Sequence, residues 1–222
     1  MRESIDGIDY RFGEPRLLEE ALTHRSAGSS NNERLEFLGD SILGMVISTR
    51  LFKRFPKASE GDLTRMRARL VRGTTLAKLG KEMNLGNEIV MEPGVMKSAG
   101  FRNSSILADA VEALLGAIYL DGGLEPCREV ILRKFDPLID ALPAPEELKD
   151  PKTRLQEWLQ ARGQGLPVYS LEFEEGADHA KTFHVSCQLD DGRRTEAQGS
   201  NRASAEQAAA AAMLEAIRGE AA

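Results

Sequence analysis

Apolar positions in this chain follow two different periods, and the change falls after about residue 140. Before it, apolar side chains recur every three or four residues, the pattern of helices with one buried face. Helices are predicted over residues 16–25, 33–55, 105–122 and 125–140, and one more follows the N-cap candidate Ser59, carrying four arginines. The N-terminal part is therefore predicted to be all helical.

The segment 33–55 contains two glycines, Gly39 and Gly44, well inside the predicted helix. A glycine in a helix interior costs about 1 kcal/mol relative to alanine, so such positions usually have a packing reason. We expect both glycines to mark places where another helix approaches closely.

After a proline-rich, polar stretch the pattern changes. Residues 153–162 read as a helix, and residues 169–173 and 183–189 then alternate between apolar and polar side chains, as strands do. Asp191-Gly192 predicts a hairpin turn, a third strand is expected near 193–197, and a last helix follows Ser200-Asn201 to about residue 218. The order is α-β-β-β-α.

These patterns predict two domains. An all-α domain covers residues 1–142, residues 143–150 form a linker, and a small α+β (α-β-β-β-α) domain covers residues 151–222.

Composition limits the class of protein. Of 222 residues, 41% are hydrophobic and 29% are charged, as in a water-soluble globular protein. Every apolar run is interrupted before membrane-spanning length, and the first residues lack the apolar core of a signal peptide. The two cysteines have no metal-ligand spacing and imply no oxidising compartment, so we expect a cytoplasmic protein without a membrane partner.

Two of the predicted helices carry carboxylates in an otherwise apolar setting. Glu33, Glu36 and Asp40 are three and four residues apart and share one helix face, where they repel each other. Asp109 and Glu112 are the only charges between residues 106 and 120. Acidic residues on helices are most often simply solvated, but buried carboxylates need compensation, so the pair of acidic faces predicts one shared cation site.

The residues Asn32 to Ser41 resemble the signature motif of the ribonuclease III family, and Asp109 to Glu112 resemble its second acidic pair. The likeness covers nearly the whole chain. It implies a homodimeric, magnesium-dependent endonuclease that cuts double-stranded RNA, of the type that processes ribosomal and messenger RNA precursors. Products would carry 5′-phosphates and 3′-hydroxyls with a short 3′ overhang.

The resemblance also implies roles for individual residues. One or two Mg²⁺ ions, with Mn²⁺ as a substitute, suit a set of oxygen ligands formed by Glu36, Asp40, Asp109 and Glu112. Asp40 and Glu112 are the expected catalytic residues, and Glu33 and Glu60 are supporting acids, Glu60 from across the dimer. Phe37 matches a position that inserts into the partner subunit, although an ordinary core aromatic fits the sequence equally well.

The C-terminal pattern resembles a double-stranded-RNA-binding domain, through residues 150–157 and 205–210. Such domains read the A-form shape of RNA across two minor grooves. The RNA contacts implied by the resemblance are Thr153, Arg154, Gln156, Glu157, Gln160, His179, Asn201, Arg202, Ser204 and Gln207. For His179 a structural role fits equally well. His24 lies in a family-like motif, Thr23 to Ser26, that precedes the acidic helix; substrate contact is one role for it, but a structural role is favoured.

The last helix departs from the family pattern. In the family, the corresponding helix often opens with several lysines or arginines. Here Arg202 is followed by Ala203 and Ser204. From Pro151 to Ala222 there are 8 Lys and Arg against 11 Asp and Glu. We therefore expect the isolated module to bind RNA weakly.

The whole chain has a net charge of −6, which argues mildly against a nucleic-acid partner unless acids gather at metals and bases line the binding face. The arginines at 65, 67, 69 and 72 fit such a face, or simply a solvated one. The main rival is a non-catalytic protein that binds double-stranded RNA, and the presence of all four acids disfavours it. A phosphohydrolase of small nucleotides would leave the C-terminal module unexplained.

Overall fold

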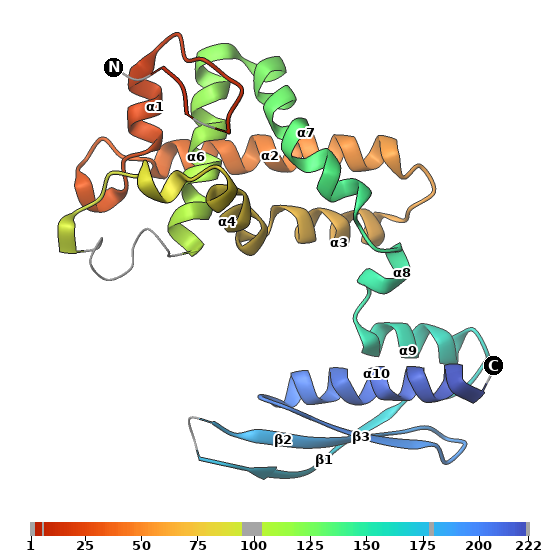
Figure 1. Cartoon of the computed structure of the whole chain (residues 1–222). Helices are drawn as coiled ribbons and strands as arrows, with labels where there is room; N and C mark the ends of the chain where they lie inside the picture. Colours follow the sequence, from red (N-terminus) through yellow and green to blue (C-terminus); the bar gives the residue numbers. More distant parts are fainter. Residues whose placement is uncertain (1–2, 6, 95–103, 178–179, 221–222) are drawn as a thin grey trace. The chain divides into compact units, whose positions relative to one another are not determined.

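The computed structural model describes residues 3–5, 7–94, 104–177 and 180–220 (Figure 1). The chain divides into two compact units, residues 1–143 and residues 144–222. Each unit has its own core, so each is described by itself.

The first unit is helical, as the sequence predicts. Its elements are α1 (Pro15–Ala21), the 3-10 turn η1 (Arg25–Ala27), α2 (Glu33–Arg54), α3 (Glu60–Val71), α4 (Gly73–Glu82), the 3-10 turn η2 (Leu85–Asn87), α6 (Ser104–Gly122) and α7 (Leu124–Asp140). The prediction of one helix over residues 16–25 was wrong at its end. Thr23 forms an isolated bridge with Val90, and this long-range pairing ends the helix at Ala21.

Helix α6 is the centre of this unit. Eleven of its residues are buried, around its whole circumference, and α1, α2, α4 and α7 all pack against it. A helix that is apolar on every side must be surrounded in this way. Figure 1 shows α6 crossing α2, and this crossing places the acidic residues of the two helices side by side.

The crossing is closest at two glycines. A Cβ atom built on Gly39 would lie 1.7 Å from the carbonyl oxygen of Glu112, and one built on Gly116 would lie 2.2 Å from that of Leu35. The packing reason predicted for Gly39 is thus confirmed, because any side chain there would collide with the backbone of α6. For Gly44 the prediction was wrong within the described part of the chain, since a Cβ there would meet nothing within 4 Å.

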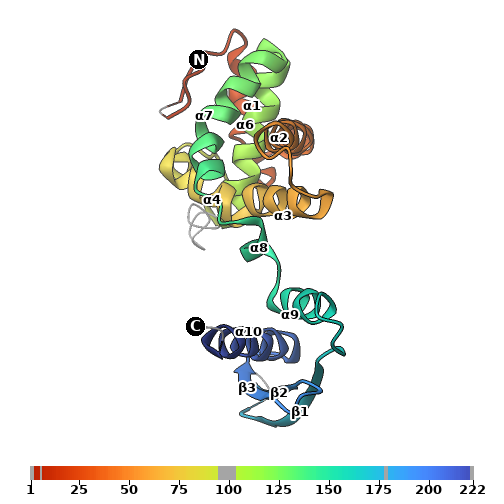
Figure 2. The ribbon, with the colours of Figure 1, turned by 90° about the vertical axis from the view of Figure 1, so that its right-hand side faces the viewer.

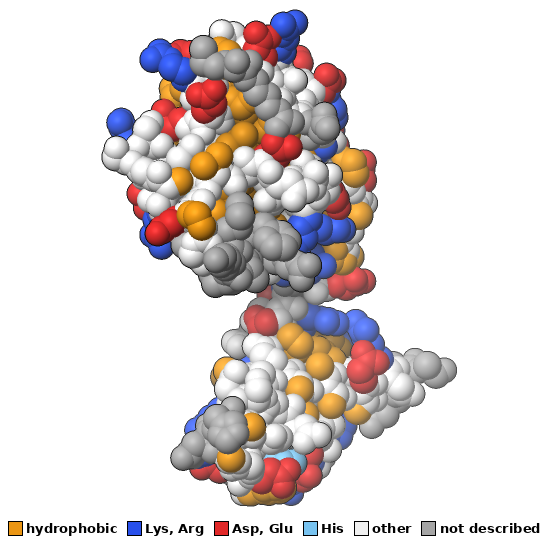
Figure 3. All heavy atoms as spheres, turned by 60° about the vertical axis from the view of Figure 1, so that its left-hand side comes forward, with side chains coloured by type: hydrophobic (Ala, Val, Ile, Leu, Met, Phe, Trp, Pro, Cys, Tyr) orange, Lys and Arg blue, Asp and Glu red, His pale blue; other side chains and the backbone are white. Residues whose placement is uncertain are grey.

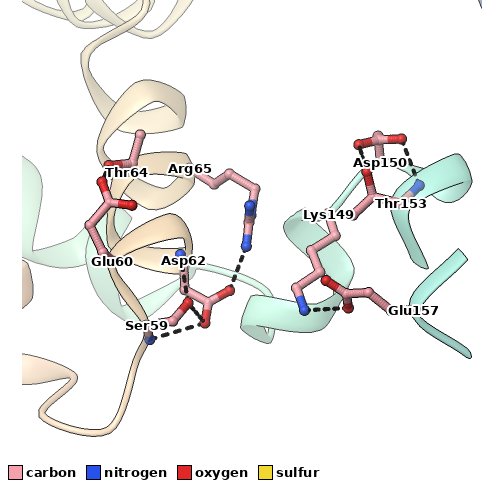
Figure 4. A network of polar contacts seen from close by, with 9 residues as sticks. All are labelled: Ser59, Glu60, Asp62, Thr64, Arg65, Lys149, Asp150, Thr153 and Glu157. Carbon is pink, nitrogen blue, oxygen red and sulfur yellow. Dashed lines mark hydrogen bonds and ion pairs between the residues drawn. The ribbon is translucent and has the colours of Figure 1, made fainter. Parts of the chain in front are cut away.

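The start of α3 is fixed by a capping box, as Ser59 predicts. The Ser59 hydroxyl accepts from the Asp62 backbone N–H at 3.2 Å, and the Asp62 carboxylate accepts from the Ser59 backbone N–H at 3.2 Å (Figure 4). These two bonds satisfy helix-end donors that would otherwise be orphaned. Arg65 also donates to Asp62, at 2.8 Å, and the bonds from Ser59 and Arg65 hold the pKa of Asp62 below its ordinary value.

The second unit has the predicted α-β-β-β-α order, preceded by α8 (Pro145–Leu148), a single turn within the stretch expected to be linker. It contains α9 (Pro151–Gln160), β1 (Val168–Glu175), β2 (Thr182–Gln188), β3 (Arg194–Gly199) and α10 (Arg202–Glu220). The strands form one antiparallel sheet in the order β1-β2-β3. Both helices lie on the same side of this sheet (Figures 1 and 2), and the core between them includes Leu155, Val185 and Met213.

No helix in the described part of the chain is both long and apolar enough to cross a membrane.

Candidate active site

Three carboxylates meet where α2 crosses α6. One carboxylate oxygen each from Glu36, Asp109 and Glu112 lies within 4.8 Å of the others, and all three side chains are half-buried. Glu36 belongs to the first turn of α2, while Asp109 and Glu112 lie one turn apart on α6. The acids are 73 to 76 residues apart in sequence, and the contact at Gly39 is what joins them.

The cluster is electrostatically strained in the absence of a cation. Burial and the charges of Asp40, Glu36 and Asp109 raise the pKa of Glu112 to about 7. Burial, helped by the neighbouring acids Asp109 and Glu33, also raises the pKa of Glu36. A divalent ion with oxygen ligands would relieve this repulsion, so the donor set fits Mg²⁺ or Mn²⁺.

Asp40 lies beside this trio rather than in it. Its side chain is exposed on the next turn of α2, and its charge is the second largest cause of the raised pKa of Glu112. Glu33 is also exposed, one turn before Glu36, with a carboxylate oxygen 3.7 Å from Arg25. Of the four ligands predicted from the sequence, the structure brings three together and leaves the fourth close by.

A cavity of about 600 Å³ opens next to the cluster. The residues that line it include the acids Glu36 and Asp109 and also His24 and Arg25. Burial raises the pKa of Asp109, and the nearby His24 and Arg25 work in the opposite direction. Sequence reasoning considered His24 but missed Arg25, although both stand in the motif Thr23 to Ser26 that precedes the acidic helix.

Glu60 and Phe37 lie apart from each other within one chain. Glu60 accepts a hydrogen bond from Thr64 at 2.8 Å (Figure 4). It also lines a groove with Ser48 and Phe52. Ser48 is 12 residues beyond Glu36, or roughly 18 Å along α2 at 1.5 Å per residue. Phe37 is 77% exposed, so it is not the ordinary core aromatic that the sequence allowed.

Three of the four arginines near α3 already have side-chain partners inside the chain, among them Arg72, whose Nε donates to the Thr75 hydroxyl at 3.4 Å. Arg65 is bound to Asp62, and Arg67 donates to the Ser48 hydroxyl at 3.1 Å. Arg72 lies between α3 and α4 in an extended conformation rather than within the helix. The arginines therefore do not form one uniform solvated face.

In the C-terminal unit, α9 presents most of its predicted RNA contacts to solvent. Gln156, Glu157 and Gln160 are exposed, and Thr153 and Arg154 are half-buried. Thr153 is tied to the N-cap residue Asp150, which accepts from both its backbone N–H and its hydroxyl (Figure 4). His179 lies outside the described residues.

The contacts predicted at the start of α10 have roles in the free chain. The Asn201 side chain accepts from the backbone N–H of Ser204 at 2.8 Å, and the Ser204 hydroxyl donates to the Asn201 carbonyl at 2.8 Å. Gln207 donates to Asp150 at 3.0 Å, which links α10 to α9. Arg202 donates to Glu206 at 2.9 Å, so its charge is partly neutralised.

Two family models match this chain. The model described as "Ribonuclease-III-like" matches residues 14–138, and the model "Double-stranded RNA binding motif" matches residues 151–217. The two matches fall on the two compact units.

Curated relatives are similar over almost the full length. A protein named Ribonuclease 3 from Xylella fastidiosa is 55% identical over 204 residues, which are 91% of this chain and 90% of the relative. Another, also named Ribonuclease 3, from Xanthomonas axonopodis pv. citri, is 54% identical over 210 residues, 94% of this chain and 93% of the relative.

Among solved structures, two of the nuclease domain of ribonuclease III from Campylobacter jejuni resemble the helical unit. One is 44% identical with a TM-score of 0.57 and covers 58% of this chain and 90% of that one. Structural flexibility is described for that nuclease domain in a region involved in dimer formation. The other is 42% identical, also with a TM-score of 0.57, and covers 60% of this chain and 92% of that one.

Proposed function

This chain belongs to the ribonuclease III family, endoribonucleases that act on double-stranded RNA, and from that premise we propose a magnesium-dependent cleavage mechanism for it. The products are 5′-phosphates and 3′-hydroxyls with a short 3′ overhang, and the substrates are ribosomal and messenger RNA precursors. The observation that carries the proposal is the gathering of Glu36, Asp109 and Glu112 within 4.8 Å of one another.

The carboxylates of this chain would hold a divalent ion at the place where the scissile phosphate binds. A bound Mg²⁺ supplies Lewis-acid chemistry, which activates the attacking water and neutralises charge on the phosphate. Glu36, Asp109 and Glu112 hold the metal, and Asp40 completes the ligand set from the next turn of α2. Because the pKa of Glu112 is raised to about 7, this carboxyl would have to be deprotonated to serve as a metal ligand near neutral pH.

In a homodimer, Phe37 of one subunit would meet the groove that contains Glu60 of the other. In a two-fold interface the same patch serves both subunits, so Phe37 of one chain enters the groove of the other. That groove, of about 420 Å³, is lined by Phe52 and Glu60. Since Phe37 follows Glu36 directly, its insertion brings the partner subunit's Glu60 close to the acidic cluster.

Replacing Phe37 by aspartate is expected to separate the dimer, because a charge would enter the apolar part of the groove. Sedimentation equilibrium of the intact chain measures this as a fall of the apparent mass toward one subunit. Leu124→Asp is the matched control, since Leu124 is also exposed, at 38%, and lies on α7. A Phe37→Asp chain that remains as dimeric as the control would disprove this interface.

The C-terminal unit binds the duplex, but weakly by itself. Arg202 is the only base between Gly199 and Gln207, and it is bound to Glu206. In the view of Figure 3, acidic and basic side chains both appear on this unit. Few phosphate contacts release few counterions, so the catalytic unit must supply part of the binding energy.

Ala203→Lys together with Ser204→Lys is expected to tighten RNA binding by residues 144–222, a compact unit with its own core. Each new phosphate contact should steepen the plot of log affinity against log salt by about 0.9. A salt titration with a duplex RNA measures both effects, and Ala203→Gln controls for side-chain size. The idea of weak binding fails if the unmodified unit already binds tightly, with a steep slope that the lysines leave unchanged.

Incubation with a long, perfectly paired RNA tests the proposed function. We expect cleavage with Mg²⁺, none with a chelator, and none of single-stranded RNA or duplex DNA. Binding of the duplex without cleavage under every metal condition would favour the rival function of a non-catalytic RNA-binding protein.

We also propose that the enzyme works in the cytoplasm, because both cysteines, Cys127 and Cys187, are free and buried. Fractionation of the host cell followed by immunodetection tests this location.

A further inference from the structure

The cavity beside the acidic cluster has a second wall that the proposed mechanism does not use. His24 and Arg25 form this wall, in a lining that also includes the acids Glu33, Glu36 and Asp109. His24 precedes η1, and Arg25 is the first residue of that turn. An acidic cluster paired with a cationic wall is an arrangement that suits a polyanion already bound to metal.

The backbone of His24 is held from both sides. Its N–H donates to the Val90 carbonyl at 2.9 Å, and the preceding carbonyl, of Thr23, accepts from the N–H of Asn32 at 2.9 Å. Asn32 directly precedes α2, so the turn is tied to the helix that carries Glu36. The position of His24 relative to the cluster is therefore fixed by the fold.

The hydrogen bonds of the His24 ring decide which nitrogen carries the proton. The backbone N–H of Ser26 donates to Nδ1 at 3.2 Å, so Nδ1 is an acceptor. The Ser26 hydroxyl lies 2.9 Å from Nδ1 and accepts from the N–H of Glu92 at 3.1 Å, which leaves its own hydrogen for Nδ1. In the neutral ring the proton then sits on Nε2, which becomes a hydrogen-bond donor.

Arg25 adds a positive charge to the same wall. Its side chain is 70% exposed, and its nearest acid, Glu33, is 3.7 Å away, which is longer than a hydrogen-bonded ion pair. The charge of Arg25 also acts to lower the pKa of both Glu36 and Asp109, so it interacts with both acids of the cavity lining. The exposed guanidinium is therefore able to contact an anion bound in this cavity.

We propose that this cavity holds the phosphate next to the scissile one in the same RNA strand, bound by His24 Nε2–H and the Arg25 guanidinium. The inference rests on the proposed function, since the acidic cluster must hold metal and the scissile phosphate. Without metal, Glu36 and Asp109 would repel a phosphate here, so this contact forms only in the metal-loaded enzyme. His24 and Arg25 thus fix the position of the strand relative to the metal.

Two replacements of His24 separate this role from a structural one. Asparagine can accept the Ser26 N–H in place of Nδ1 and is a good cap residue, but it loses the Nε2 donor. Glutamine can place a donor near Nε2 but loses the acceptor. For His24→Asn we expect a wild-type unfolding midpoint with kcat/KM lowered about 10-fold to 100-fold, the value of a hydrogen bond to a charged group.

For His24→Gln we expect the reverse of the asparagine variant: a lower unfolding midpoint, but a kcat/KM closer to that of wild type. If cleavage follows the unfolding midpoint instead, so that the asparagine variant cuts like wild type, His24 is only a cap and the proposal is overturned. A wild-type chain that cuts no duplex RNA would refute the proposed function itself, which is a distinguishable result.

Arg25 is tested by the salt dependence of cleavage. Arg25→Ala should lower the slope of log kcat/KM against log salt by about 0.9, the value for one phosphate contact, and Arg25→Lys should largely restore it. Arg16→Ala is the control, because Arg16 is 79% exposed and pairs with Glu14 on α1. Duplex binding in a chelator should be equal for Arg25→Ala and wild type. An unchanged slope for Arg25→Ala would contradict the assignment.

Discussion

Replacing Glu112 by glutamine is expected to lower the rate of duplex cleavage about 1,000-fold or more while leaving duplex binding nearly unchanged. In the proposed site Glu112 is a metal ligand, because one of its carboxylate oxygens lies within 4.8 Å of one from Glu36, and its loss would remove a charge that holds the metal. Several kcal/mol of transition-state stabilisation depend on such a metal, and each 1.36 kcal/mol corresponds to about tenfold in rate. Single-turnover cleavage in saturating Mg²⁺ and a gel-shift titration measure the two quantities.

The same variant should not be destabilised. The folded protein raises the pKa of Glu112 from 4.5 to about 7, so ionising this group opposes folding. In a chelator above pH 7, Glu112→Gln should therefore unfold at a higher temperature than wild type, and the difference should vanish as the pH falls toward 4.5. Glu129→Gln, an exposed acid on α7, should change neither cleavage nor this pH dependence.

Dimers that mix wild-type and Glu112→Gln chains extend the test. If each subunit cuts one strand, such dimers should nick the duplex rather than cut it through. Equal cutting of both strands by isolated mixed dimers would rule out this division of labour, and near wild-type cutting by pure Glu112→Gln would remove Glu112 from the site.

Replacing Gly39 by alanine is expected to destabilise the helical unit by about 3 kcal/mol or more, a large fraction of the total stability of a domain. The new methyl group would lie 1.7 Å from the carbonyl oxygen of Glu112, so α2 and α6 must move apart. This movement would also separate Glu36 from Glu112, and a misplacement of about 1 Å in an active site can cost 100-fold in rate. Denaturant unfolding and cleavage below the melting range measure the two effects.

Gly61→Ala is the matched control for that change. The new methyl in the first turn of α3 would meet only the flexible end of the Arg65 side chain, at 3.3 Å. Because alanine is the better helix former, the control should gain up to about 1 kcal/mol. A Gly39→Ala chain with wild-type stability and rate would show that the two helices tolerate separation, contrary to the structure.

Local patterns in the sequence predicted most of the elements, because helix and strand periods depend on neighbouring residues. The spacing of Glu33, Glu36 and Asp40 on one helix, and of Asp109 and Glu112 on another, indicated a cation site. The alternation in residues 169–173 and 183–189 indicated the sheet. The bases absent at 203 and 204 were also visible without a structure. Such features need no information about contacts between distant residues.

Other features depended on contacts between residues far apart in sequence. The helix expected over residues 16–25 stops at Ala21 because Thr23 pairs with Val90, 67 residues later. Phe37 proved to be exposed, since only the packing of α2 against α6 decides which side of α2 is covered. Glu60 begins α3 and lines a groove with Ser48, which is 12 residues beyond Glu36 on α2.

By itself, the sequence determined which residues carry charge, which segments fold locally, and the α-β-β-β-α order of the second unit. Only the tertiary structure decided which of the two mid-helix glycines is a crossing point, and hence which acids meet. Gly39 allows α6 to approach and so sets Glu36 against Glu112, while Asp40 stays one turn aside. The physical reason is that a periodic pattern fixes only the face on which a side chain lies. The distance to a partner is set by how closely two backbones pack.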